Sequence, residues 1–469
     1  SACLLNPVGG APSAGPNAAA SETPPARTGA TLTALERAVE LLRGFHFGTY
    51  GRVGLSADLE RGSRARPLNV VSHGPRLEEP PYAELDLGYA LTRQHGLGFR
   101  VLFTLGLLEQ LFHYDGEFDA SLAVRNLYAE ATHVLIPGLS LWVGSRMYRG
   151  DDIYLLDYWP LDNLNTIGGG ARLQLGRTEL KLHVGVNRLD DLYQFQRVTI
   201  PGATSGTREV VVLDRQRTIV SAKASHDLPK VAGDLSLKVA GYGELHHLPP
   251  GRLRRDIDDP VERLPSDLGY VVGLQLGAWG FARASFVNLW IRYAGGLAAY
   301  GEHGIPFGLD QDKRTTGAKE LVLALSANYE RGMVGLMLGG YTRYFEDADG
   351  VDSDPDDGWE GVVVVRPHLL LHRHLHGVFE LSYQVRRPSG LDPASGSHLV
   401  PGVFKASVMP TLSWDRGSLA RPQLRLVYTV SYLDEGARRG FPAPDPRRGV
   451  AVRHFVGAQV EWWYNSSYR

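Results

Sequence analysis

Aromatic, charged and hydroxyl side chains recur at every second position in several stretches of this sequence. The positions are Tyr50, Arg52, Ser56 and Asp58 in one stretch, Tyr82, Glu84 and Asp86 in a second, and Gln459, Glu461 and Trp463 in a third. Aromatic rings offer flat apolar surfaces, and charged groups offer strong hydrogen bonds. A wall that carries both can hold a polar ligand weakly and reversibly, without covalent chemistry.

The positions between these polar residues are mostly apolar, which is the period of a β-strand with two different faces. Thr178–Arg188, Gly233–Tyr242 and Gln423–Tyr432 show the alternation most clearly. About sixteen to eighteen such segments of roughly ten residues follow one another from Gly44 to Tyr464, as in a membrane barrel. In a membrane the polar face must be the lumen, because an arginine that faces hydrocarbon costs about 2–4 kcal/mol.

The composition excludes several other classes of protein. The 469 residues carry a formal charge of −2, which argues against a nucleic-acid binder, and 43% are hydrophobic, which argues against an acidic disordered chain. The single cysteine, Cys3, excludes an internal disulfide framework and a cysteine-ligated metal site. No apolar run approaches the roughly 18 residues that a membrane helix needs.

These observations predict an all-β fold, a transmembrane antiparallel β-barrel of about 18 strands with short periplasmic turns and long extracellular loops. The short turns include Gly377 and Asp415–Gly417, and the long loops include His246–Pro265, Tyr300–Gly317, Glu346–Gly358 and Asp434–Arg447. The rival is a soluble sandwich. Aromatic residues near strand ends favour the barrel, because they resemble an interfacial girdle; they are Tyr89, Phe99, Tyr428, Tyr432, Trp462 and Tyr464.

We expect two parts in the chain. Residues 1–43 form a flexible segment rich in Ala and Pro, with a short helix at residues 31–43, and residues 44–469 form the barrel. Because the chain does not begin with methionine, we expect that a signal peptide has been removed. Cys3 follows Ser1-Ala2, as at the end of a lipoprotein signal, although a processed lipoprotein would begin at the cysteine itself.

Several motifs in their order along the chain resemble the maltoporin family of sugar-specific porins. They include Tyr50–Gly54, Tyr82–Gly88, Trp142–Tyr148, Asp152–Trp159, Val365–Pro367, Ala420–Arg425 and Gly457–Trp463. The resemblance runs from about Gly44 to Tyr464. It implies a homotrimer of eighteen-stranded barrels in the bacterial outer membrane, through which maltodextrins move by facilitated diffusion. It also implies an inward-folded loop that narrows each pore.

The family lines its pore with aromatic rings over which sugar rings slide, beside a track of charged residues. Carried onto this sequence, the resemblance implies an aromatic slide of Tyr50, Tyr82, Trp159 and Trp463 and a polar track of Arg52, Glu84, Arg125 and Asp157. A glucosyl ring has an apolar C–H face and a rim of hydroxyls, which these two sets suit. Trp159 precedes Pro160, which breaks strand pairing, so we place it in the loop that enters the lumen.

The sequence departs from the family at several of these positions. The second loop offers Phe112, His113 and Tyr114 where the family has a tryptophan, and Trp159 replaces the constriction tyrosine. Tyr154 replaces a track histidine, and Gly150, with Arg149 beside it, replaces a track arginine. Arg125 matches a further track arginine only after a two-residue gap.

Two functions remain open: a sugar-selective porin, and a general diffusion porin for small hydrophilic solutes. An enzyme is the distant third reading, because no nucleophile elbow, phosphate loop or paired-carboxylate motif is present. We expect no catalytic residue, cofactor or metal; the partners we expect are oligosaccharides, outer-membrane lipid and two further copies of the chain, but no nucleic acid. The aspartates of residues 347–357 suit a solvated acidic loop better than a calcium loop, and His372, His374 and His376 suit a solvated rim cluster.

Overall fold

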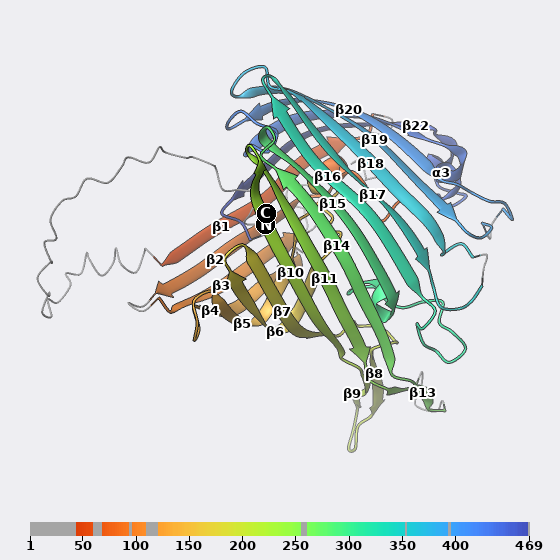
Figure 1. Ribbon diagram of the computed structural model, residues 1–469. Coiled ribbons are helices and arrows are strands. Elements are labelled where there is room, and N and C mark those ends of the chain that lie inside the picture. Colours follow the sequence, from red (N-terminus) through yellow and green to blue (C-terminus); the bar gives the residue numbers. More distant parts are fainter. Residues whose placement is uncertain are drawn as a thin grey trace, which may run out of the picture.

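The computed structural model describes residues 44–59, 68–92, 96–108, 121–254, 260–351, 354–392 and 395–467 (Figure 1). The segment expected at residues 1–43, including its helix, lies outside the described residues, as do Phe112, His113 and Tyr114. In the part of the chain that is described, no helix is both long and apolar enough to cross a lipid bilayer.

Eighteen strands form one antiparallel sheet in which each strand pairs with its neighbours along the chain. They are β1 (Phe45–Ala57), β2 (Tyr82–Thr92), β3 (Gly98–Leu108), β4 (Ser121–Thr132), β5 (Leu139–Arg149), β6 (Asn163–Leu175), β7 (Thr178–Asn187), β10 (Arg217–Ala232), β11 (Leu235–Leu248), β14 (Asp267–Trp279), β15 (Arg283–Gly296), β16 (Lys319–Arg331), β17 (Val334–Glu346), β18 (Gly358–Leu369), β19 (Leu375–Pro388), β20 (Gly402–Ser413), β21 (Gln423–Leu433) and β22 (Val452–Tyr464). Because β1 pairs with both β2 and β22, the sheet is closed, and the predicted fold is confirmed.

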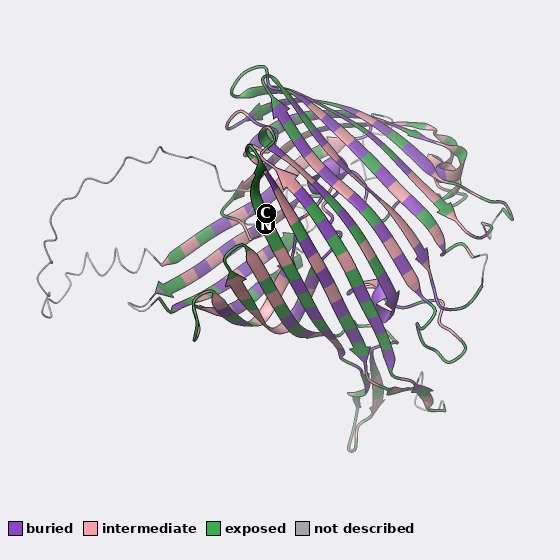
Figure 2. Cartoon of the chain, in the orientation of Figure 1, coloured by how far each residue is buried: buried purple, intermediate pink, exposed green. Residues whose placement is uncertain are grey.

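Buried and exposed residues alternate along most strands, as the banding in Figure 2 shows. On β21, Leu424, Leu426 and Tyr428 are exposed, whereas Gln423, Arg425 and Thr429 at the alternate positions are buried. An apolar outer wall and a polar inner wall are what a barrel in lipid requires, because unpaired polar groups are costly in hydrocarbon.

One rim carries short turns and the other carries long loops, as predicted. Gly176 and Gly233 adopt positive φ in two of the tightest turns, those between β6 and β7 and between β10 and β11. Gly377 does not form a turn as expected: it lies inside β19, and the bend before it falls at residues 370–374.

The long loops contain structure that the sequence did not predict. Two of them carry small hairpins, β8 (Phe195–Pro201) with β9 (Thr207–Asp214) and β12 (Gly251–Leu253) with β13 (Glu262–Leu264), and another carries the helix α3 (Glu435–Arg439).

Two of the connections on the long-loop side run into the barrel, and we call them the first inner loop (residues 68–81) and the second inner loop (residues 150–162). Val71 and Leu77 of the first and Ile153, Leu155 and Leu161 of the second are all buried. Irregular backbone at membrane depth needs a protein-lined or water-filled interior around it. These loops therefore define the narrow part of the lumen.

Candidate functional site

The seam that closes the barrel brings the first and last strands together. Tyr50 of β1 and Trp463 of β22 are Cα partners across this seam, and on its other side Tyr50 is the partner of Glu84 on β2. Arg52 is paired with Tyr82 on β2 and with Glu461 on β22. Strand pairing alone thus places six inward-facing side chains on one patch of wall.

The four residues of the predicted slide meet at this patch. Tyr50, Tyr82 and Trp159 form one buried cluster, and Trp463 packs against it half-buried. The ring centroids of Tyr50 and Tyr82 are 6.0 Å apart. Their exposed fractions are 0% for Tyr50, 7% for Tyr82 and 5% for Trp159, so these rings are mostly covered by their neighbours.

The four charged residues of the predicted track surround the same rings. The guanidinium of Arg52 lies 5.3 Å from the centroid of Tyr82 and 3.7 Å from the carboxylate of Asp157. Nε of Arg125 lies 3.4 Å from the carboxylate of Glu84, to which the Tyr82 hydroxyl also donates a hydrogen bond. Arg52, Arg125 and Asp157 keep side-chain exposures of 20%, 24% and 16%, whereas Glu84 is buried. The structure therefore brings all eight predicted site residues together, with the track more accessible than the slide.

Ion pairs fix the base of the second inner loop to the barrel wall. Nζ of Lys223 lies 2.8 Å from the carboxylate of Asp162, and Nζ of Lys238 lies 2.6 Å from that of Asp151. Apolar side chains of the same loop, among them Ile153, pack against the wall formed by β14 to β18. A loop held at its base and along one side can keep Trp159 in a fixed position in the lumen.

A tight turn shapes the tip of the second inner loop. Ile153 and Tyr158 form a two-residue antiparallel bridge, in which the Ile153 amide donates to the Tyr158 carbonyl over 2.7 Å. Asp157 closes this turn in the left-handed region at φ 51°, a conformation that Asp tolerates better than most residues. The turn directs the loop back toward β1 and β2 immediately before Trp159.

The glycine at position 150 has a structural reason. A Cβ built there would lie 1.9 Å from Oδ1 of Asp162, the carboxylate that pairs with Lys223. The neighbouring Arg149 supplies a cation instead, with its guanidinium 4.1 Å from the ring centroid of Trp159. A cation thus lies beside the ring of Trp159 although position 150 carries no side chain.

Arg125 lies at a β-bulge in β4. Asn126 pairs with Thr104 on β3, but Leu105 pairs with Val124, so Arg125 is an extra residue opposite no partner. A bulge re-aims the side chain of the extra residue. Arg125 consequently reaches Sδ of Met147, 2.9 Å away, and the carboxylate of Glu84.

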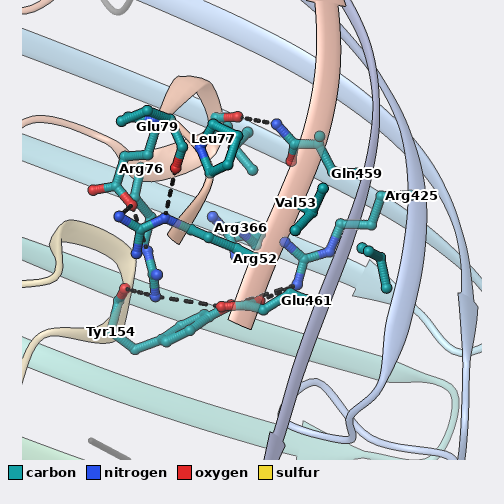
Figure 3. A pocket seen from close by; sticks show the side chains of 14 residues that line it. Arg52, Val53, Arg76, Leu77, Glu79, Tyr154, Arg366, Arg425, Gln459 and Glu461 are labelled. Carbon is teal, nitrogen blue, oxygen red and sulfur yellow. Dashed lines mark hydrogen bonds and ion pairs between the residues drawn. The ribbon is translucent and has the colours of Figure 1, made fainter. Parts of the chain in front are cut away.

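Sequence reasoning did not predict an arginine cluster beside the seam. Figure 3 shows Arg76 of the first inner loop, Tyr154 of the second, and Arg425 and Glu461 of the wall converging. Glu461 accepts hydrogen bonds from Tyr154 Oη over 2.5 Å, from Arg425 over 2.7 Å and from Arg421 over 3.0 Å. Strand alternation could have placed Arg425 in the lumen, whereas Arg76 lies in irregular backbone with no periodic signal.

Arg76 joins the two inner loops to the seam. Its Nη2 lies 2.5 Å from the hydroxyl of Tyr50, and its Nη1 lies 3.3 Å from the carbonyl of Tyr154 and 3.5 Å from the carboxylate of Glu461. The cavity left between this arginine and the wall is only about 30 Å³, enough for a water molecule but not for a sugar ring.

The remaining polar signals of the sequence are arranged differently from the expectation. Asp347 and Asp357 are buried rather than solvated, because the Asp347 amide donates to Asp357 within the loop, and burial raises the pKa of Asp347 to about 6. His376 is buried on β19 whereas His372 and His374 are exposed in the preceding bend, so the three histidines share no face.

Comparisons with known proteins identify a family and several similar solved structures. Residues 45–464 match the sequence profile of the family described as LamB porin. Similar solved structures include Pseudomonas aeruginosa OccK1 (OpdK), 12% identical with a TM-score of 0.41, covering 90% of this chain and 99% of the other. Another is Pseudomonas aeruginosa OccD3 (OpdP), which is 9% identical with a TM-score of 0.44 and covers 90% of this chain and 92% of its own. The trimer form of Vibrio cholerae OmpT is 10% identical with a TM-score of 0.43 over 90% and 100%.

Proposed function

This chain belongs to the LamB porin family and forms a β-barrel channel of the outer membrane. We propose that the channel lets sugars cross by facilitated diffusion, and that these sugars are maltodextrins or related oligosaccharides. The aromatic rings serve as the slide and the charged residues as the polar track beside it.

One observation carries this proposal. Four aromatic and four charged side chains, drawn from β1, β2, β4, β22 and the second inner loop, gather at the narrow part of the lumen. Aromatic planes suit the C–H face of a sugar ring, and charged groups exchange hydrogen bonds with its hydroxyls. Several weak contacts of this kind favour entry of the sugar and still allow it to leave.

The proposal can be tested by transport into liposomes that contain the purified protein. Entry rates should be measured for glucose, maltose, maltotriose and longer maltodextrins beside non-glucose oligosaccharides of equal size. A facilitated pathway predicts that maltodextrins enter faster than the size-matched sugars. Rates that depend on molecular size alone would contradict it.

A general diffusion porin is the second candidate, and the covered slide favours it. Tyr50 is fully buried. The guanidinium of Arg149 lies 4.1 Å from the ring centroid of Trp159, and that of Arg421 lies 4.4 Å from the ring centroid of Trp463. Those arginines must move aside before a sugar can stack on either ring. If they do not, the pore selects by size and charge only, which is the size-dependent outcome of the liposome experiment.

The assembly state and the division of the chain are part of the same proposal. We propose a homotrimer embedded in outer-membrane lipid, with residues 1–43 outside the barrel of residues 44–469; the motive is the family resemblance. Chemical cross-linking of the purified protein in mild detergent should give a trimer as the largest species. A product that stays monomeric at all cross-linker concentrations would contradict the trimer.

A further inference from the structure

A second cavity opens at the long-loop rim, away from the seam. Its volume is about 280 Å³, and its lining includes Ser72, Tyr300, Phe307, Arg343, Phe345 and Arg386. This volume lies just below the roughly 300 Å³ at which small-molecule sites begin, so it suits one ring-sized ligand rather than a chain. We call it the rim cavity.

Segments that are distant in sequence converge on the rim cavity. Arg343 and Phe345 lie near the end of β17, where Phe345 is the Cα partner of Gly358 on β18. Tyr300 and Phe307 come from the loop after β15, and Ser72 comes from the first inner loop. Strands β20 and β21 separate this part of the wall from β22, so the rim cavity is not part of the aromatic cluster at the seam.

Three aromatic rings form one side of the rim cavity. The centroid of Tyr300 lies 5.3 Å from that of Phe307 and 5.4 Å from that of Phe345, and the two phenylalanine centroids are 5.6 Å apart. Tyr300 and Phe345 are buried, whereas Phe307 is 44% exposed. The Tyr300 hydroxyl also donates to the Phe307 carbonyl over 2.7 Å, so an exposed ring is held in place by buried ones.

Charged side chains complete the rim cavity, and their charges nearly cancel. Arg343 and Arg386 face Asp356, Asp357 and Glu360. Nε of Arg343 donates to Glu320 over 2.5 Å, while its Nη1 remains 3.9 Å from Glu360, beyond hydrogen-bond distance. Such a lining gives no strong preference for an anion or a cation, but it offers hydrogen bonds to a neutral ligand with many hydroxyls.

The rim cavity is connected to the narrow part of the lumen. The backbone amide of Ser72 donates to Glu360 over 3.2 Å, and the next residue, His73, stacks on Tyr158 of the second inner loop at 4.1 Å. Tyr158 immediately precedes Trp159. The first inner loop therefore forms a continuous path of contacts from the rim cavity to the predicted constriction.

We infer that the rim cavity is a glycosyl-binding site that captures one neutral sugar ring before the oligosaccharide enters the constriction. The inference rests on the proposed function. Phe307 supplies the stacking surface, and Arg343 and Arg386 supply hydrogen bonds to the hydroxyl rim. Capture at the mouth raises the rate at which a sugar arriving from the long-loop side finds the pore.

The test compares Phe307→Ala with Phe281→Ala, which removes an equally exposed phenylalanine, also 44%, from the short-turn rim. Association rates of maltotriose and maltohexaose are measured from current noise in oriented bilayers, with sugar added to one side at a time. Phe307→Ala should lower the rate from the long-loop side about two- to tenfold and leave the rate from the other side unchanged. Phe307→Trp, which keeps a stacking ring, should retain the wild-type rate or exceed it.

The outcomes separate this inference from the proposed function. If sugars block the wild-type pore but Phe307→Ala and Phe281→Ala associate equally fast from the long-loop side, the rim cavity is not a capture site. If no sugar blocks the wild-type pore from either side, the proposed function fails and the capture site fails with it.

Discussion

Tyr50 and Trp463 face each other as Cα partners where the first and last strands close the barrel, yet only Trp463 keeps part of its side chain exposed. Tyr50 is fully buried, and its hydroxyl receives a hydrogen bond from Arg76. Trp463 is half-buried, with its centroid 5.9 Å from that of Tyr154 in an edge-on arrangement. Of this pair, Trp463 is therefore the ring that keeps some exposed surface.

Trp463→Ala should weaken block by malto-oligosaccharides with little change in ion conductance, because Trp463 lies on the wall rather than in a loop. Loss of one stacking contact is worth about 0.5–1.5 kcal/mol, or about two- to tenfold in the sugar dissociation constant. Trp462→Ala is the matched control, since Trp462 is the preceding residue and faces the outer side, where its Nε1 donates to Thr49 over 3.2 Å. Equal sugar affinities in the two variants would refute the role of Trp463.

Trp159→Ala should raise ion conductance and weaken sugar block together. Trp159 is the large ring that the second inner loop places in the narrow part of the lumen, so its removal widens the pore as well as removing a stacking surface. Trp159→Phe should restore part of both properties. A variant whose conductance rises while sugar affinity stays at the wild-type value would show that Trp159 fills space without binding sugar.

Arg76→Ala should increase conductance and current noise, because Arg76 connects the first inner loop to Tyr50, Tyr154 and Glu461. Removing one partner of a buried ion pair leaves the other uncompensated and is typically costly, at about 3–5 kcal/mol. Single-channel recording checks this directly. Arg373→Ala is the control, because Arg373 pairs with Asp415 at 3.0 Å in an exposed position on the opposite rim. Wild-type current in Arg76→Ala would mean that the first inner loop needs no such anchor.

Glu302 predicts a pH dependence of stability. Both carboxylate oxygens of Glu302 accept a hydrogen bond from the backbone amide of Asn165, over 2.8 and 2.7 Å. Burial raises the pKa of Glu302 to about 7 from an ordinary value of 4.5. The folded chain thus keeps a proton that the unfolded chain releases. The contribution of Glu302 to the free energy of unfolding is most favourable below about pH 4.5. It decreases as the pH rises to about 7 and stays constant above that pH. The total decrease is on the order of 3 kcal/mol at most.

Thermal unfolding in detergent between pH 4 and 8 should show this effect as a difference between two proteins. In Glu302→Gln, which cannot ionise, the midpoint temperature should rise relative to wild type as the pH increases from 4.5 to 7. Parallel pH profiles for the two proteins would show that Glu302 is already ionised throughout this range.

Strand alternation predicted the parts of the site that lie on the wall. The inward positions of Tyr50, Tyr82, Glu84 and Trp463 follow from period two, and the pairing of β1 with β22 follows from closure of the barrel. Arg125 escaped this rule because a bulge adds one residue to β4, which depends on the neighbouring strand and leaves no mark in the local sequence.

The two inner loops were predicted less completely. Pro160 indicated that Trp159 belongs to irregular backbone, but no periodic pattern reports where a loop packs. Arg76 and Tyr154 meet Glu461 only because both loops fold back across the lumen. The burial of Asp347 and Asp357 has the same origin, since it depends on hydrogen bonds within a loop rather than on the spacing of its acidic residues.

The most direct test of the central claim is the conductance of the purified wild-type protein in planar bilayers, titrated with malto-oligosaccharides of increasing length and with sucrose. A sugar slide predicts saturable block of the ion current, with an affinity that rises from maltose to maltohexaose as more rings stack along the pore. If none of these sugars blocks the current at any concentration, the pore has no sugar-binding path, and the channel is a general diffusion porin.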